Sequence, residues 1–489
     1  MALPTKTSEY QKKNLDAYLS FIFNYSKKHH PGEYWLSPVV ANNIWISDIF
    51  LEITKRGCSR ENSKFNSKII FLHGLLNLIL GFFREIARFI CLKVFFILFK
   101  FIKGRTLGFK QRRYIIFTFI DDRCFATGAY KDVFTGSIVN RYSVKEVLII
   151  PVFIKTSIKN IKLFLRDAKN TEKNIHLLSR EITFPSVQWI KFPTSPVLFD
   201  GIDVSDLLLK EISKYSFRGL STDLAFKKIG GYNLSKVEKI FYPFENQNWE
   251  RCLCASLKLN PSFNGVSIAL QNAPASLLSL RFTLPKISIS DFPAPDIIIA
   301  RDKVSLGRLR DSWGSLSSVQ KGENQREFLD LKDQRQNVKK DSIFVPLSIG
   351  ERETQSFIKF LRESNKISGF HLYLCEHPLL PTNVKDELIK LVESNENMDM
   401  VDYRYGMKNC EYVMATTSTA LLEGLTNNLI PLQFVSDDFV SASPLDILNG
   451  LEELVSFRNW HELSSILSLK NLRSKCLNYK KEIETLMKN

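Results

Sequence analysis

The sequence lacks the motifs that would assign a metal or redox function. Its eight cysteines include one close pair, Cys252 and Cys254, which does not have the two-residue spacing of zinc knuckles and redox motifs. It also has no Asp-x-Asp motif to hold a divalent ion on a nucleotide diphosphate. Scattered thiols in apolar segments behave as small hydrophobic side chains. We therefore predict a protein of the reducing cytoplasm with no metal site and no cofactor.

The sequence also lacks an uncharged apolar run long enough to cross a bilayer. The densest apolar segment is 69–103, and its uncharged part, 69–83, has 15 residues. A spanning helix needs roughly 20. Arginine and lysine recur among phenylalanines and leucines beyond that part, which favours a helix, or a helical hairpin around Gly81, lying in the membrane interface. A buried helical pair and a true span are the alternatives.

Acidic residues are outnumbered by basic ones, 51 against 67, which gives a formal net charge of +16. Such an excess calls for an acidic partner. No nucleic-acid-binding motif is present, so we predict no nucleic-acid partner and consider anionic lipid and phosphorylated substrates. Residues 1–13 lack the apolar core of a secretory signal. We expect a cytoplasmic protein that lies peripherally at the inner face of the cytoplasmic membrane.

Short apolar runs alternate with helical stretches along most of the chain. A chain of 489 residues is too long for one core, so two or three domains are expected. The runs do not alternate apolar with polar residues, which is typical of buried parallel strands. The expected strands are 114–120, 146–152, 239–244, 265–271, 296–300, 342–347, 371–375, 411–415 and 430–434. Strands and helices in this order predict doubly wound α/β domains.

A polar segment divides these strands into two series. Residues 304–340 are rich in Ser, Gln, Asn, Lys and Arg, which is typical of a domain boundary. We predict an N-terminal domain over 1–310 that includes the basic apolar helical insertion, a linker over 311–340, and a C-terminal domain with closing helices over 341–489. The predicted fold class is therefore α/β, with two Rossmann-like domains.

Two strands of the second series end in polar turns. The first runs into His377 and Pro378, and proline holds the preceding residue in an extended conformation. The second runs into four hydroxyl residues, 416–419, that open a helix, and hydroxyls at a helix N-terminus suit a phosphate. Glu423 could accept from a ribose hydroxyl, and Gly350 permits close approach of the backbone to a donor. The alternatives are a loop histidine and a simple helix cap.

These motifs resemble those of bacterial sialyltransferases and Kdo transferases that use CMP-activated sugars. The resemblance implies that His377, Ser418 and Thr419, with Thr417 as an alternative, contact the CMP phosphate. The wider chain resembles bacterial surface-carbohydrate biosynthesis proteins over 244–250, 269–273 and 293–298. Two Rossmann-like domains joined by a linker are the architecture of GT-B glycosyltransferases. That resemblance implies a cleft with the donor nucleotide on the C-terminal domain and the acceptor on the N-terminal one.

The catalytic carboxylate has two candidates. The acidic-acidic-glycine motif of those sialyltransferases has only one echo here, Asp200 before Gly201. Glu245 is preferred, because it ends a buried strand and could take a proton from an acceptor hydroxyl; a cap for the next helix is the alternative. Gln271 and Asn272 could bind acceptor hydroxyls. Two further residues, Glu250 and Arg251, are expected on the solvated side of the helix after Glu245.

The sequence therefore predicts a glycosyltransferase of surface polysaccharide synthesis. The predicted donor is a CMP-activated sugar acid, Kdo or sialic-acid-like, and the acceptor is a glycan or a lipid-linked glycan. An anionic inner-membrane surface is the third predicted partner. The alternatives are a GT-B glycosyltransferase that uses a UDP- or GDP-sugar, and a non-catalytic membrane-associated capsule assembly protein.

Overall fold

The computed structural model describes most of the chain. The described residues are 6–30, 32–37, 39–40, 48–59, 67–103, 109, 112–125, 130–153, 158–170, 174–178, 181, 193, 195–216, 220–322, 331, 334–335, 338–348, 350–363, 369–377, 380–440 and 442–488. Pro378, one of the predicted site residues, lies outside them.

The first sheet has six parallel strands in the order β2-β1-β5-β6-β7-β8. Its strands are β1 Tyr114–Ile120, β2 Val147–Phe153, β5 Lys239–Phe244, β6 Val266–Gln271, β7 Ile297–Ala300 and β8 Ser318–Lys321. All seven residues of β1 are buried, as expected of a strand covered on both faces. The strand order reverses between β1 and β5. That pair is therefore the topological switch point of this sheet, where doubly wound sheets bind ligands.

The second sheet also has six parallel strands, in the order β11-β10-β9-β12-β13-β14. Its strands are β9 Lys339–Pro346, β10 His371–Cys375, β11 Met398–Met400, β12 Cys410–Ala415, β13 Ile430–Phe434 and β14 Ser456–Phe457. The first strand lies in the middle and the chain winds outward on both sides, so the switch point is between β9 and β12. Two parallel six-stranded Rossmann-like sheets confirm the predicted fold class.

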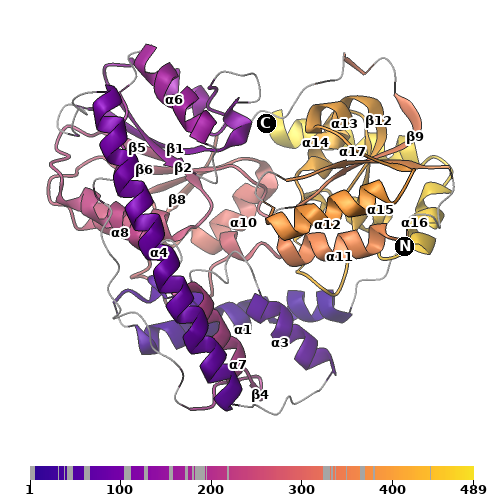
Figure 1. Cartoon of the computed structure of the whole chain (residues 1–489), viewed down its shortest axis with the longest axis horizontal. Helices are drawn as coiled ribbons and strands as arrows, with labels where there is room; N and C mark the ends of the chain where they lie inside the picture. The colour runs from indigo at the N-terminus through magenta and orange to yellow at the C-terminus, as the bar shows by residue number, and fades with distance from the viewer. Residues whose placement is uncertain are drawn as a thin grey trace.

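Helices connect the strands and cover the sheets (Figure 1). In the first half they are α1 Lys6–His29, α3 Asp48–Ser59, α4 Ser67–Lys103, α5 Gly136–Val139, α6 Ile158–Asn170, α7 Ser205–Tyr215, α8 Leu220–Lys227, α9 Asn248–Lys258 and α10 Lys303–Trp313. In the second half they are α11 Glu351–Leu361, α12 Thr382–Glu393, α13 Tyr403–Asn409, α14 Ala420–Thr426, α15 Leu451–Val455, α16 Trp460–Leu467 and α17 Leu472–Lys488. Each sheet has its own hydrophobic core.

The predicted linker segment 311–340 contains structure that belongs to the first sheet. Strand β8, Ser318–Lys321, pairs in parallel with β7. Three of its four residues are exposed, so it is a polar edge strand without the apolar run by which the other strands were predicted. The first sheet therefore extends to Lys321, while the domain boundaries themselves stay a prediction.

The apolar segment 69–103 forms a single helix, α4, with no hairpin around Gly81. A glycine inside a helix costs about 1 kcal/mol relative to alanine, which does not break a helix that packs along its length. The prediction of a hairpin is therefore wrong. Within the described residues, no helix combines the length and the apolar character that crossing a membrane requires.

Candidate active site

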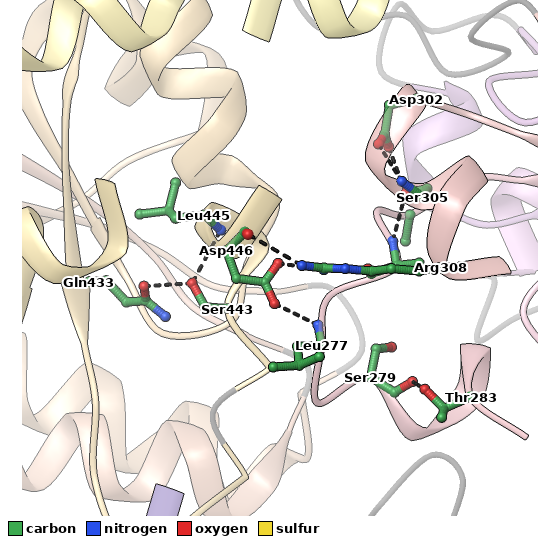
Figure 2. A network of polar contacts seen from close by, with 12 residues as sticks. Leu277, Ser279, Thr283, Asp302, Ser305, Arg308, Gln433, Ser443, Leu445 and Asp446 are labelled. Carbon is green, nitrogen blue, oxygen red and sulfur yellow. Dashed lines mark hydrogen bonds and ion pairs between the residues drawn. The ribbon is translucent and has the colours of Figure 1, made fainter. Parts of the chain in front are cut away.

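Loops that follow the carboxyl ends of the two sheets lie against each other (Figure 2). Asp446, in the short helix η10 (Pro444–Ile447) beyond β13, accepts from the backbone N–H of Leu277 at 2.5 Å and from Arg308 at 2.9 Å. Leu277 lies in the loop after β6, and Arg308 also donates to the carbonyl of Ala275 in that loop at 2.7 Å. Burial raises the pKa of Asp446, and the Arg308 guanidinium opposes that shift. The carboxyl edges of both sheets therefore border one interface.

The two predicted turns of the second sheet lie on either side of its first strand. Strand β10, which leads to His377, and strand β12, which leads to the hydroxyl run, both pair with β9. Neighbouring strands are about 4.8 Å apart, so the two turns are separated by roughly 10 Å at the same edge. The sequence thus indicated two turns at one edge of the sheet, of which the hydroxyl run borders the switch point between β9 and β12. It missed the residue between them, Glu353.

Glu353 connects the turn after β9 to the hydroxyl run. Its Oε1 accepts from the hydroxyl of Thr416, from the Thr417 hydroxyl at 2.6 Å and from the Thr417 N–H at 2.9 Å. Its Oε2 accepts from the Ser348 hydroxyl at 2.7 Å. Two of the four hydroxyls therefore already have a carboxylate partner, and one of them is Thr417, the alternative phosphate contact; Glu353 makes no such bond to Ser418 or Thr419, the pair predicted first.

The other two hydroxyls are arranged around the start of α14. The Ser418 hydroxyl accepts from the backbone N–H of Ala420 at 3.2 Å. Thr419 is the N-cap residue, but its side chain makes no capping hydrogen bond. Glu423 is buried in the first turn, and its carboxylate accepts from the Tyr403 hydroxyl at 2.8 Å. Because α14 has only seven residues, its dipole is a weak anion site, and binding there would depend on the hydroxyls.

His377 and Gly350 lie in the neighbouring turns. His377 is half-buried two residues beyond β10, and its carbonyl accepts from the N–H of Leu380 at 3.0 Å. Gly350 is the N-cap residue of α11. A Cβ atom at Gly350 would lie 2.9 Å from Oε2 of Glu353, so this glycine leaves room for that carboxylate. The space predicted to admit a donor is therefore filled by Glu353.

Glu245 lies at the switch point of the first sheet, directly after β5. It is half-buried, and its Oε2 accepts from the Gln247 side chain at 3.2 Å, while Trp249 donates to Oε1 of Gln247 at 2.8 Å. The N-cap residue of α9 is Gln247, so Glu245 does not cap this helix. The carboxylate of Glu245 thus lies at the carboxyl edge of the first sheet, at the end of a buried strand as the sequence indicated.

Glu250 and Arg251 are buried, so their prediction as solvated residues is wrong. The Glu250 carboxylate accepts the N–H groups of Glu245 at 3.1 Å and Asn246 at 2.9 Å. Burial raises its pKa well above the ordinary value. Arg251 donates to the carbonyls of Trp35 at 2.6 Å and Asn246 at 2.8 Å, and burial lowers its pKa to about 10. Both side chains hold the turn that carries Glu245.

Two asparagine amides beside Glu245 are buried and lack hydrogen-bond partners among the described residues. They belong to Asn246 and Asn272, which are 1% and 2% exposed. The strands that lead to them end side by side, because Phe244, the last residue of β5, pairs with Gln271, the last residue of β6. Gln271 itself is occupied: its amide donates to the carbonyl of Ala273 at 2.8 Å and accepts from the N–H of Arg301 at 2.9 Å. Of the two predicted acceptor residues, Asn272 thus retains its hydrogen-bonding capacity.

Positive charge lies close to the same edge. Arg281 interacts electrostatically with the carboxylates of Glu245 and Glu250, which oppose the lowering of its pKa by burial. Arg301 is 2% exposed and donates to the carbonyl of Asn272 at 2.9 Å. The sequence did not single out either arginine, because Arg281 lies in a three-residue helix, Leu280–Phe282, and Arg301 directly follows β7, and neither segment is long enough to show a periodic pattern.

Asp200 lies in a different part of the molecule. It forms the turn between the short strands β3 (Leu198–Phe199) and β4 (Ile202–Asp203), with φ values of 49° at Asp200 and 76° at Gly201. Such a turn requires residues that tolerate left-handed conformations, and Asp-Gly is typical of it. Figure 1 shows β4 beside α7, far from the label of β5. Asp200 thus forms part of a hairpin turn, and its side chain is exposed.

Among the described residues, no group of three His, Cys, Asp or Glu side chains is placed to hold a metal ion. The prediction of a metal-independent reaction remains a prediction.

No protein-family model and no curated protein matches the sequence. Several solved structures have similar folds at low identity. MnaA from S. aureus, solved with UDP, has a TM-score of 0.38 and 10% identity and covers 77% of this chain and 98% of its own. UGT89C1 from Arabidopsis thaliana, complexed with UDP-L-rhamnose, has a TM-score of 0.42 and 10% identity, with 77% and 94% covered. A mutant of the O-GlcNAc transferase from Thermobaculum terrenum has a TM-score of 0.36 and 11% identity, with 98% and 85% covered.

Likenesses of this size carry no argument about the reaction. The architecture rests on the chain's own topology, which is α/β with two parallel six-stranded Rossmann-like sheets in a GT-B-like arrangement.

Proposed function

We propose that this protein is a glycosyltransferase that takes its sugar from a nucleotide-activated donor. The nucleotide binds at the switch point of the second sheet, and the acceptor binds at that of the first. The proposal is supported mainly by the carboxyl edges of the two sheets, because each sheet has a carboxylate at its switch point, Glu245 in the first and Glu353 in the second. The loops beyond these edges are in contact through the hydrogen bond from Leu277 to Asp446. Ligands of such sheets bind outside the carboxyl ends of the strands.

Glu245 acts as the general base in this proposal. Its carboxylate removes the proton from an acceptor hydroxyl, and the hydroxyl oxygen attacks the anomeric carbon of the donor sugar. The bond from that carbon to the phosphate oxygen breaks, and the nucleotide leaves with the electron pair. The amides of Asn246 and Asn272 support this assignment, because buried amides that find no partner in the described part of the chain can pair with sugar hydroxyls.

The donor is the part of the proposal with two candidates. A CMP-activated sugar acid follows from the resemblance carried by His377, Ser418 and Thr419. A UDP- or GDP-sugar is the second candidate, and one observation favours it. Glu353 already binds the hydroxyl of Thr417, the alternative phosphate contact, so the hydroxyl run offers a single phosphate fewer free groups than the resemblance implies, and only Ser418 and Thr419 stay in that role.

The proposed biological setting is surface polysaccharide synthesis, with a glycan or lipid-linked acceptor at the inner face of the cytoplasmic membrane. The charge of +16 supports an anionic surface and phosphorylated substrates as partners.

The test is turnover with a panel of donors. The full chain is mixed with CMP-Kdo, CMP-sialic acid, a UDP-sugar or a GDP-sugar and with glycan and lipid-linked acceptors, and nucleotide release is measured. Acceptor-dependent release of CMP supports the first donor, and release of UDP or GDP supports the second. If no nucleotide is released and none binds by calorimetry, the chain is a non-catalytic assembly protein and the proposal fails.

A further inference from the structure

Helix α4 exposes an apolar stripe. Leu72, Leu76, Ile79, Phe83, Ile90 and Val94 follow one another at intervals of four, three, four, seven and four residues, and all are exposed. This spacing places them on one face of the helix. Leu72 is 70% and Phe83 61% exposed, which is far above the exposure of a core side chain. From Leu72 to Val94 the stripe is about 33 Å long.

The opposite face of α4 holds the helix on the protein. Gly74 and Glu85 are buried on that side. A Cβ atom at Gly74 would lie 3.6 Å from Cβ of Ser213 and 3.7 Å from Cγ of Leu209, both in α7. Figure 1 shows α4 crossing the near side of the first domain, with α7 beside its lower part and no element in front of it. The helix therefore packs through a glycine-containing face and turns its large apolar side chains outward, which is the reverse of an ordinary surface helix.

Cationic side chains border the stripe. Arg84 is exposed on one flank and Lys93 is half-buried on the other, whereas Arg88 lies further round the helix, on the side that faces Asp223. Long cationic side chains can lay their stems on apolar surface while their charged ends reach lipid headgroups. A straight apolar stripe with cations along its sides fits a plane that is apolar below and anionic above.

We propose that this face of α4 binds the surface of an anionic lipid bilayer, with the stripe at the boundary between headgroups and acyl chains. The charge of the stripe's flanks decides for lipid over a second copy of this chain, since two such faces would bring the cations Arg84 and Lys93 of one copy close to those of the other. The inference rests on α4 alone and is independent of the proposed glycosyl transfer.

The experiment is flotation of the full chain with two kinds of vesicle: phosphatidylcholine alone, and equal parts of phosphatidylcholine and phosphatidylglycerol. The chain should float with the anionic vesicles and much less with the neutral ones. Leu76→Glu with Phe83→Glu should lower the partition coefficient by about tenfold or more, because two apolar side chains no longer enter the membrane. Leu259→Glu is the control, since Leu259 is 83% exposed outside α4.

The charge is tested separately. Arg84→Gln should lower binding to the anionic vesicles by about fivefold, which is the contribution of one cation near an anionic surface. Lys236→Gln removes one exposed cation elsewhere and should have a much smaller effect. All variants change exposed side chains, and unchanged thermal unfolding would show that they fold.

Three results would overturn the inference: no flotation of the wild type with anionic vesicles, equal flotation of the Leu76→Glu, Phe83→Glu variant, or flotation unaffected by Arg84→Gln. A wild-type dimer in sedimentation velocity that the glutamate variant abolishes, together with absence of flotation, would assign the face to self-association instead. Nucleotide binding by the glutamate variant should equal that of the wild type. Failure of the membrane inference is therefore distinguishable from failure of the proposed reaction.

Discussion

The switch points of the two sheets each have a buried glutamate at the start of the following helix, but the two glutamates bind different partners. In each domain a glutamate occupies the third position of the helix that follows a switch-point strand: Glu250 in α9 after β5 and Glu353 in α11 after β9. Glu250 folds back on the N–H groups of its own turn, and Glu353 binds the hydroxyls of the neighbouring turn. Glu250 holds the turn that carries Glu245, and beside it two buried amides stay unpaired among the described residues. Glu353 instead provides hydrogen-bond acceptors for the hydroxyls of Thr416 and Thr417.

The carboxyl edge of the first sheet can therefore bind a ligand as it stands, whereas the edge of the second sheet has to rearrange before a ligand reaches Thr416 and Thr417. A buried polar group without a partner costs about 1–3 kcal/mol, so a fold retains it where a ligand or water completes it. Asn246 and Asn272 fit that description. At the second edge a phosphate would meet the Glu353 carboxylate, which either moves aside or keeps the donor away from Thr416 and Thr417.

The largest expected effect is at the first edge. Glu245→Gln should lower turnover by about 10²- to 10⁴-fold, the usual contribution of a general base, and leave nucleotide affinity unchanged. Nucleotide release in the presence of acceptor measures the first quantity and calorimetry the second. Asp200→Asn is the matched variant and should retain full activity, because Asp200 lies in a hairpin turn. The reverse pattern would make Asp200 the base.

A second substitution removes the support of that edge. Glu250→Ala should lower the free energy of unfolding by about 3 kcal/mol, because two buried N–H groups lose a carboxylate acceptor. Urea unfolding measures the change. Glu250→Gln keeps one acceptor oxygen, so its free energy of unfolding should fall by less than that of Glu250→Ala. A free energy of unfolding unchanged in the alanine variant would show that water replaces the carboxylate and that the turn does not depend on it.

At the second edge, removing charge should help the ligand. Glu353→Gln should raise the affinity for the donor nucleotide by about tenfold, which corresponds to about 1.4 kcal/mol of like-charge repulsion relieved. Glu351→Gln is the control, since Glu351 is exposed in the same first turn. Calorimetry with the nucleotide that binds the wild type measures both affinities. Weaker binding by Glu353→Gln would mean that this carboxylate orients the hydroxyls for the ligand.

The smallest effect concerns the contact between the two domains. The pKa of Glu452 is raised from 4.5 to about 7, mainly by burial, with a smaller contribution from Asp446 and with Lys12 opposing the shift. A carboxyl with a raised pKa in the folded state binds more protons there than in the unfolded state, so stability should fall as pH rises from 4.5 to about 7. Glu452→Gln should flatten this part of a pH–stability profile. Glu453→Gln, an exposed neighbour, should leave the slope unchanged.

Much of the fold was predictable because buried parallel strands leave a direct trace in sequence. The runs that became β1, β5 and β10 were predicted with the bounds that the structure has. Edge strands leave no such trace: β8 is mostly exposed, so its residues are polar. For α4, composition predicted an apolar helix but could not show which face packs on α7.

The site was predictable to the level of strand ends and no further. The sequence indicated the turns that carry Glu245, His377 and the hydroxyl run. It could not indicate that Glu353 reaches Thr416, since 63 residues separate them in the chain. One signal was available for both buried glutamates: glutamate at the third helical position is the place from which a side chain folds back on the preceding turn.

The proposed donor site at the second switch point is tested most directly by calorimetry of the full chain with CMP, CDP, UDP and GDP. We expect saturable binding of one of these nucleotides with one site per chain, and a change in its affinity in Glu353→Gln but not in Glu351→Gln. Binding of none of the four would contradict the claim that the second switch point is a donor site.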